Sequence, residues 1–236
     1  MAASHDKVMT MAALNPQVKT MEYAVRGPIV IRAVELEKEL AAGQPKPFSS
    51  VIKANIGDAH AMGQQPITFI RQVLSAVANP AVLANSDIPS DVKQRAETIL
   101  GGCGGKSVGA YSQSTGVDVI RKHVAEFIER RDGGIASDPE NVILSGGASE
   151  SIRNVLKLFI NHTSSKKVGI MVPIPQYPLY SATIEEFGLG QVGYFLNESN
   201  NWGLDESELE RAYQESKKEF DTKVIVVINP GNPTGQ

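Results

Sequence analysis

The sequence predicts an α/β protein with a largely parallel sheet. From about residue 140 onward, short apolar runs typical of strands alternate with longer segments whose apolar residues recur at helical spacing. The Val-Ile-Val-Val-Ile run at 224–228 is continuously apolar, as expected for a strand that is buried on both faces. Strands that alternate with helices form crossover units, and the strands of such units run parallel.

The first half of the chain is predicted to be mainly helical. Segments with apolar residues every three or four positions end at proline or glycine. They predict helices over 30–40, 67–78, 90–100 and 117–131, and a short strand is expected over 51–54. The side chains expected to face inward are Ile70, Val73, Leu74 and Val77 in the second helix and Ile120, Val124, Phe127 and Ile128 in the fourth.

The second half carries the strand–helix alternation. Strands are predicted over 142–144, 168–172, 191–196 and 223–228, and helices over 149–160 and 177–187. A further helix is expected to begin at Asp205, where Glu208 stands three residues on. This spacing is the signature of a capping box, in which the two side chains cap each other's backbone N–H groups.

Composition excludes several classes of protein. The 236 residues include 23 basic and 26 acidic side chains, a net charge of -3 that gives no reason to expect nucleic acid or a membrane surface as a partner. No stretch approaches the ~18 apolar residues of a membrane span. The single cysteine, Cys103, rules out an internal disulfide framework and fits a reducing compartment. We expect a cytoplasmic protein because Met1 to Gln17 lack an apolar signal core, with a mitochondrial location still open.

Two glycine-rich turns are candidate anion sites. The segment Ser145-Gly-Gly-Ala-Ser-Glu150 follows a predicted strand and opens a helix, so its backbone N–H groups can face a phosphate. The alternative is a turn that is glycine-rich for steric reasons only. The segment Gly101-Gly-Cys-Gly-Gly-Lys-Ser107 looks like a nucleotide P-loop, but Leu100 stands where that motif needs glycine and a helix precedes it. We interpret it as a turn.

Two further motifs follow predicted strands. Tyr177 comes after the strand at 168–172, where an aromatic ring can stack on a flat ligand, although a plain core or surface tyrosine is the alternative. The segment Asn229-Pro-Gly-Asn-Pro-Thr-Gly235 contains two Asn-Pro pairs, which force a rigid path and can fix a side-chain amide toward a ligand oxygen. The alternative is a plain turn. The four histidines are isolated, so no metal site is expected.

Together these motifs resemble the fold type I, class I/II aminotransferases that use pyridoxal 5'-phosphate. The resemblance runs from about residue 15 to the end of the chain, and several segments are similar to the alanine aminotransferase branch. These segments are Asn15-Pro-Gln-Val-Lys19, Glu22-Tyr-Ala-Val-Arg-Gly-Pro-Ile-Val-Ile-Arg32, Asn55-Ile-Gly-Asp-Ala-His-Ala-Met-Gly-Gln-Gln-Pro66, Arg130-Arg-Asp-Gly-Gly134 and Pro173-Ile-Pro-Gln-Tyr-Pro-Leu-Tyr-Ser181.

The resemblance implies a role for four cofactor-binding residues. Ala148 and Ser149 would hold the cofactor phosphate through backbone N–H and hydroxyl groups. Tyr177 would stack on the pyridine ring, and Asn232 would donate a hydrogen bond to the phenolic oxygen of the cofactor. The ring itself would act as the electron sink for a carbanion on the amino acid.

The resemblance also implies a homodimer and a closing segment. Tyr111 looks like the tyrosine that reaches the phosphate held by the other subunit, so the active sites would be shared. Ile56 and Gly57 look like the N-terminal segment that closes over the substrate carboxylate.

The family's Schiff-base lysine, the aspartate at the pyridine nitrogen and the arginine that grips the substrate carboxylate would all lie beyond Gln236. Lys223, in a predicted strand, does not match that lysine. We therefore expect an incomplete fold type I aminotransferase, with an N-terminal arm and small-domain segment over 1–65 and a truncated part of the large cofactor-binding domain over 66–236. Alone, the chain is expected to be inactive and prone to aggregate at an unpaired strand edge.

The implied reaction of the complete protein moves an amino group between L-alanine and 2-oxoglutarate, giving pyruvate and L-glutamate. Another class I aminotransferase, such as one for glutamate and glyoxylate, is an alternative. A short non-catalytic form that acts through the dimer surface is a second. A dinucleotide-dependent oxidoreductase is disfavoured because the G-x-G-x-x-G fingerprint is missing.

Overall fold

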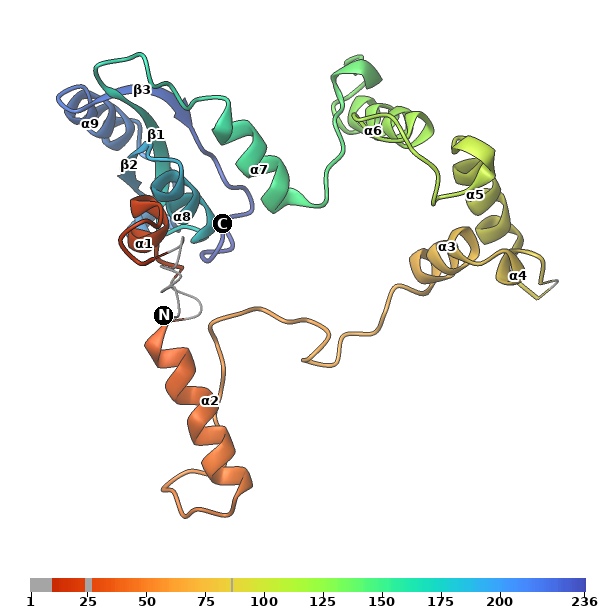
Figure 1. The fold of residues 1–236 in the computed structure, drawn as a ribbon, viewed down its shortest axis with the longest axis horizontal. Coiled ribbons are helices and arrows are strands. Elements are labelled where there is room, and N and C mark those ends of the chain that lie inside the picture. The colour runs from red at the N-terminus through yellow and green to blue at the C-terminus, as the bar shows by residue number, and fades with distance from the viewer. Residues whose placement is uncertain (1–9, 24–26, 86) are drawn as a thin grey trace, which may run out of the picture. The chain divides into compact units, whose positions relative to one another are not determined.

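A computed structural model describes residues 10–23, 27–85 and 87–236. The chain forms two compact units (Figure 1). One combines Met1–Ile56 with Ile152–Gln236, and the other consists of Gly57–Ser151. Helix α7 (Ala148–Lys157) begins in the second unit and ends in the first. The predicted domain boundary at residues 65 and 66 stays a prediction.

The first unit is built on a parallel three-stranded sheet. Its strands are β1 (Lys167–Ile174), β2 (Gly190–Phe195) and β3 (Phe220–Ile225), in the order β2-β1-β3. The central strand β1 is buried over most of its length, which explains its continuous apolar sequence. The predicted α/β class with a parallel sheet is confirmed.

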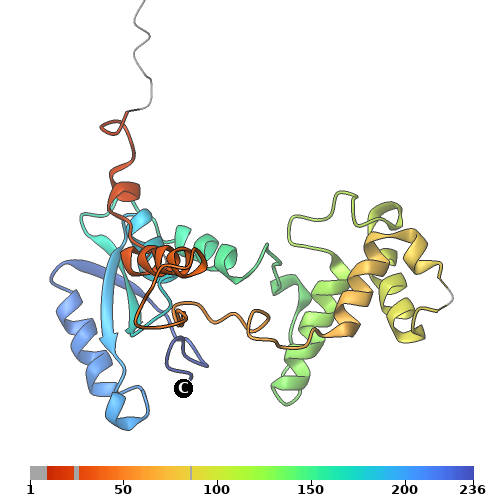
Figure 2. The same cartoon turned by 90° about the horizontal axis from the view of Figure 1, so that it is seen from below.

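Helices cover both faces of this sheet (Figure 2). Helix α8 (Leu179–Glu186) connects β1 to β2, and α9 (Glu206–Ser216), after a 3-10 turn at Glu198–Asn200, connects β2 to β3. One buried cluster consists of Leu156, Val168, Ile170, Val172, Ile184 and Leu189, from α7, β1 and the α8 region. The cluster on the α9 side consists of Met171, Val192, Tyr194 and Ala212. Alternate residues of β1 thus face opposite layers, as strand geometry requires.

Two helices precede the sheet in the same unit. Helix α1 (Pro16–Thr20) contacts α8, and the Thr20 hydroxyl donates a 2.5 Å hydrogen bond to the Glu185 carboxylate. Helix α2 (Pro28–Ala41) includes the predicted helix at 30–40, and every residue in it keeps part of its surface exposed. The strand expected over 51–54 is wrong, because no segment among the described residues pairs with it.

The second unit is helical. It contains α3 (Thr68–Ala78), α4 (Pro80–Leu83), α5 (Ser90–Gly101) and α6 (Asp118–Arg131), with 3-10 turns at Gly104–Lys106 and Pro139–Asn141. The buried residues between α3 and α5 are Val73, Ala76, Val92 and Ala96. The predicted helices are confirmed, and within the described residues none is long and apolar enough to cross a membrane.

The predicted inward faces are only partly correct. Ile70 and Leu74 of α3 are 51% and 59% exposed, and Phe127 of α6 is 57% exposed. The buried residues of α6 are instead Arg121 and Ala125. Periodicity finds an apolar face, but the contacts of the unit decide how much of that face is covered.

The strand predicted over 142–144 is also wrong. Ile143 is 71% exposed, and the bonds of this segment to other parts of the unit run from the Leu144 N–H to the Thr115 carbonyl and from the Arg121 side chain to the Val142 carbonyl, both at 2.9 Å. A strand requires a neighbouring strand to which it is hydrogen-bonded, and an apolar sequence alone does not provide that neighbour. The strand predicted over 223–228 is present, but it begins at Phe220 and ends at Ile225.

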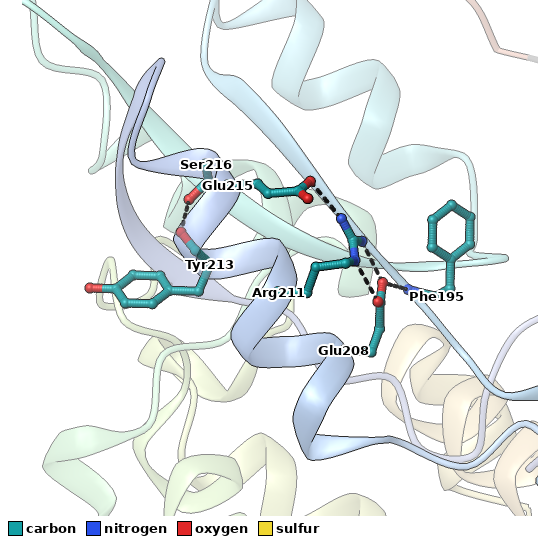
Figure 3. A network of polar contacts seen from close by, with 6 residues as sticks. All are labelled: Phe195, Glu208, Arg211, Tyr213, Glu215 and Ser216. Carbon is teal, nitrogen blue, oxygen red and sulfur yellow. Dashed lines mark hydrogen bonds and ion pairs between the residues drawn. The ribbon is translucent and has the colours of Figure 1, made fainter.

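The capping box at the start of α9 is wrong as well. The Asp205 carboxylate accepts a hydrogen bond from the Asn197 amide at 2.8 Å and makes no cap bond. The Glu208 carboxylate accepts the backbone N–H of Phe195 at 2.9 Å and pairs with Arg211 at 2.6 Å (Figure 3). Both acidic side chains are taken by residues outside the predicted pair, so α9 is tied to β2 instead of capping itself.

Candidate functional site

Two predicted site residues follow neighbouring strands of the sheet. Tyr177 comes after β1, which ends at Ile174, and Asn232 comes after β3, which ends at Ile225. The two strands are adjacent and parallel, so their carboxyl ends lie at the same edge. Ligands of parallel α/β sheets bind beyond this edge. The structure therefore brings these two side chains to one end of the sheet.

Tyr177 is held by a second tyrosine from the N-terminal segment. The Tyr23 phenol donates a 3.0 Å hydrogen bond to the phenol oxygen of Tyr177. Tyr177 itself is half-buried, which leaves part of its ring open to a flat ligand. Burial raises the pKa of the nearby Tyr180 phenol, and the neighbouring Tyr177 phenol adds to this. Tyr23, Tyr177 and Tyr180 thus place three phenols near one another.

No local sequence motif assigns a role to Tyr23. It lies in the Glu22-Tyr-Ala-Val-Arg-Gly-Pro28 segment that carries the family resemblance. Its partner Tyr177 stands 154 positions away, so no local pattern signals the contact. The resemblance of this segment was the one available hint.

Asn232 lies in a loop that closes on itself. The Gly231 N–H donates to the Gln236 carbonyl at 2.6 Å, and the Gly235 N–H donates to the Gly231 carbonyl at 2.7 Å. The Asn229–Pro230 and Asn232–Pro233 peptides are both cis. Within this loop the Asn232 side chain is exposed, so its amide is accessible to a ligand oxygen.

The glycine-rich turn leads into α7 as expected. Gly147 has a φ of 124°, which is open to glycine and strained for other residues. The Ser145 hydroxyl donates to the Gly147 carbonyl at 3.0 Å, and the Gly146 N–H donates to the Glu150 carboxylate at 2.6 Å. One N–H group of the turn is therefore already occupied.

Ala148 and Ser149 begin the helix. Backbone N–H groups in the first turn of a helix have no carbonyl partner within the helix. Both residues are exposed, and no hydrogen bond of the described residues uses their N–H groups. With the Ser149 hydroxyl they form a compact set of donors, suited in number and type to a phosphate.

The remaining predicted residues are surface residues. The Tyr111 side chain is fully exposed, and Ile56 is 51% exposed, with Gly57 exposed beside it. Ala148, Ser149, Tyr111 and Gly57 belong to the second unit, whereas Tyr177, Asn232 and Ile56 belong to the first. The convergence of these residues on one ligand stays a prediction.

Two other segments behave as expected. Helix α5 ends at Gly101, so a helix leads into the segment that looks like a P-loop, and the interpretation as a turn is confirmed. Lys223 lies within β3 and pairs with Asp221 at 2.9 Å. Its ammonium is thus held on the strand, in keeping with its failure to match the family's lysine.

Comparison with known proteins agrees with this picture. Residues 72–236 match the family model for aminotransferase class I and II. The chain is 57% identical to alanine aminotransferase 2 of Xenopus laevis and 56% identical to alanine aminotransferase 1 of Homo sapiens. Each alignment covers 98% of this chain but only 43% and 46% of the relative, so the chain spans about half the length of these proteins.

Solved structures show the same likeness. Alanine aminotransferase from Pyrococcus furiosus superimposes with a TM-score of 0.63 at 27% identity, covering 94% of this chain and 45% of that one. The arrangement of a parallel sheet with flanking helices is therefore that of known aminotransferases. The match to the family model over most of the chain shows that it belongs to the aminotransferase class I and II family.

Proposed function

We propose that a full-length protein containing this chain transfers an amino group between L-alanine and 2-oxoglutarate, giving pyruvate and L-glutamate. Pyridoxal 5'-phosphate is the proposed cofactor. The observation that carries the proposal is the position of Tyr177 and Asn232 beyond the carboxyl ends of adjacent parallel strands, in a chain whose relatives at 55–57% identity are named alanine aminotransferases.

The donors present fit a phosphorylated pyridine. Ala148 and Ser149 offer two backbone N–H groups and a hydroxyl at a helix N-terminus, which suit the phosphate. Tyr177 offers an aromatic face, and Asn232 offers an exposed amide for an oxygen on the ring. The Glu150 carboxylate is engaged by the Gly146 N–H, which moderates its repulsion of an anion nearby.

Each residue has a positioning task in this proposal. When bound, the pyridoxal group supplies an electron sink that stabilises negative charge at the amino acid's α-carbon. Tyr177 covers one face of the ring and excludes water from it. Tyr23 fixes the Tyr177 phenol, and Asn232 orients the ring through its oxygen. The lysine base, the aspartate and the arginine of the family are expected in residues that follow Gln236.

The reaction is tested with the full-length protein, the cofactor, L-alanine and 2-oxoglutarate. Pyruvate is measured through coupled NADH oxidation, and glutamate is measured by chromatography. Equimolar formation of both products supports the proposal. A higher kcat/KM with glutamate and glyoxylate than with alanine and 2-oxoglutarate would replace the substrate assignment and keep the reaction class.

The Asn232→Ala variant is expected to lower kcat/KM by about tenfold or more, because a hydrogen bond to a charged oxygen contributes about 1.5–3 kcal/mol. Asn154→Ala, which removes another exposed amide of the same unit on helix α7, serves as a matched control. Equal rates for the two variants would contradict the role of Asn232.

The 236-residue chain alone is proposed to be inactive, because the family's lysine is expected beyond it. Pyruvate formation by this chain would overturn that statement. A measurable association of the chain with the full-length protein, without activity of its own, would favour the alternative of a short regulatory form.

A homodimer is also proposed, with Tyr111 reaching the partner's cofactor phosphate. Its full exposure leaves the phenol accessible to a second subunit. Sedimentation of the full-length protein gives the oligomeric state, and a monomer that is fully active would contradict the shared site. We further propose a cytoplasmic location, with a mitochondrial one as the alternative, because the single cysteine fits a reducing compartment; cell fractionation distinguishes the two.

A further inference from the structure

A buried guanidinium contacts the segment that leads into the glycine-rich turn. Arg121, on the second turn of α6, is 2% exposed and is among the largest fully buried side chains of the described residues. A charged side chain is seldom buried unless hydrogen bonds replace the water that it loses. Its partners therefore show what the charge is used for.

Those partners are two carbonyls of the segment that leads into the turn. The Arg121 Nε donates to the Val142 carbonyl at 2.9 Å, and Nη2 donates to the Pro139 carbonyl at 2.7 Å. Nη2 also lies 3.2 Å from the Glu140 carboxylate, but that side chain is 74% exposed and its attraction is screened by water. The carbonyl bonds are thus the main contacts, and only a planar, forked cation reaches both.

The same side chain also reaches the segment that follows Tyr111. Nη1 donates to the Gln113 side-chain oxygen at 3.4 Å. Close by in sequence, the Leu144 N–H donates to the Thr115 carbonyl at 2.9 Å. Arg121 and the bond between Leu144 and Thr115 together join segment 113–115 to segment 139–144. The first segment lies shortly after Tyr111, and the second directly precedes the glycine-rich turn that begins at Ser145.

Close packing fixes the position of Leu144, the residue that precedes the glycine-rich turn. Gly116 has a φ of 109°, and a methyl group there would lie 2.6 Å from a methyl carbon of Leu144. The Leu144 side chain therefore packs directly against the backbone of Gly116. Ser145 follows at once, and its hydroxyl holds the turn by donating to Gly147.

From these contacts we propose that Arg121 is a positioning residue for the cofactor phosphate: through the carbonyls of Pro139 and Val142 it sets the turn that aims the N–H groups of Ala148 and Ser149. The inference rests on the proposed function, because it takes the phosphate of pyridoxal 5'-phosphate as the ligand of that turn. It assigns no contact between Arg121 and the cofactor itself.

The test compares binding of pyridoxal 5'-phosphate with binding of pyridoxal, which lacks the phosphate. Equilibrium dialysis is carried out on the full-length protein and on its Arg121→Met, Arg121→Lys and Gly116→Ala variants. Lys122→Met is the matched control, since Lys122 is the next residue of α6 and pairs at the surface with Asp118. Arg121→Met and Gly116→Ala are expected to raise the Kd of the phosphorylated form at least tenfold and that of pyridoxal less than threefold.

Hydrogen exchange without cofactor provides a second readout. In Arg121→Met, the hydrogen-bonded amides of Val142, Leu144 and Gly146 are expected to exchange at least tenfold faster, whereas those of the α3 and α5 core keep their protection. If the α3 and α5 core also loses protection in Arg121→Met, the Arg121→Lys variant distinguishes a positioning role from a general structural role. It should restore the core but leave the Kd of the phosphorylated form at least threefold above that of the parent protein.

Three results overturn the inference. They are equal losses for the two ligands in a variant with a protected core, unchanged Kd values in Arg121→Met, and full recovery of phosphate binding in Arg121→Lys. A parent protein that binds both ligands equally contradicts the proposed cofactor instead, and the exchange data then still test whether Arg121 sets the turn.

Discussion

The phenol of Tyr23 donates a 3.0 Å hydrogen bond to the phenol oxygen of Tyr177, joining the N-terminal segment to the loop that follows β1. The two residues stand 154 positions apart. A residue proposed to cover the cofactor ring is therefore held from outside its own loop.

Replacing Tyr23 by phenylalanine tests this contact. A neutral hydrogen bond contributes about 0.5–1.5 kcal/mol, so the Kd for pyridoxal 5'-phosphate in the full-length protein is expected to rise about two- to tenfold. Tyr213→Phe is the control, since it removes a phenol on α9 away from the strand ends. Equal Kd values for the two variants would show that the bond does not orient Tyr177.

Glu208 predicts an acid-sensitive part of the stability. Its bonds to Arg211, and to the Phe195 N–H, lower its pKa from 4.5 to about 2. Because the pKa is lower in the folded state, the carboxylate stabilises the fold fully above about 4.5 and this contribution disappears as the pH falls toward 2.

The Glu208→Gln variant should therefore be less stable than the parent protein at pH 6, and the difference should shrink between pH 4.5 and pH 2. Urea denaturation at several pH values measures it. Glu215→Gln, at an exposed partner of the same Arg211, is expected to have a smaller effect. A pH-independent difference would contradict the low pKa of Glu208.

Gly169 predicts a steric limit inside the sheet. An added methyl group would lie 2.6 Å from the Thr222 hydroxyl and 3.2 Å from the Thr222 backbone. Gly169→Ala is therefore expected to lower the free energy of unfolding by about 1–3 kcal/mol, as other overpacked cores do. Gly101→Ala, where the space is open, should be neutral or stabilising by up to about 1 kcal/mol. Calorimetry that ranked the variants in the opposite order would refute the clash.

The outer side of β3 predicts self-association of the 236-residue chain. No strand among the described residues pairs with that side, and Ile225 and Val227 are 48% and 59% exposed. Exposed apolar edges promote pairing between chains. Ile225→Lys is expected to reduce light scattering by concentrated protein. Ile29→Lys, at an exposed isoleucine of α2, should leave it unchanged. Equal scattering by both variants would exclude the edge as the cause.

Local sequence patterns predicted the parts of the fold that depend on local forces. Helices α3, α5 and α6 have apolar periodicity and end signals of their own, β1 is a continuous apolar run, and β2 alternates buried and more exposed residues. These signals do not depend on contacts with distant parts of the chain.

The incorrect predictions depend on distant partners. The runs at 51–54 and 142–144 have the composition of strands but no paired neighbour among the described residues. Glu208 has the spacing of a capping box, yet Arg211 and the Phe195 N–H compete for it successfully. The burial of Arg121 was not predicted, because a basic residue on a helix is expected to face water. Family resemblance supplied the site residues, but it did not supply the side chains that hold them.

The bond from the Phe195 N–H to Glu208 makes the two edge strands of the sheet, β2 and β3, unequal in their capacity to pair with a further strand. The Leu196 N–H points inward to the Ile174 carbonyl of β1, so the preceding N–H of Phe195 points outward, where the carboxylate covers it. A further strand that paired with the outer edge of β2 would have to displace the Glu208 carboxylate, which is held by Arg211. We therefore expect the sheet to widen in one direction only, beside β3, whether the added segment comes from the same polypeptide or from another.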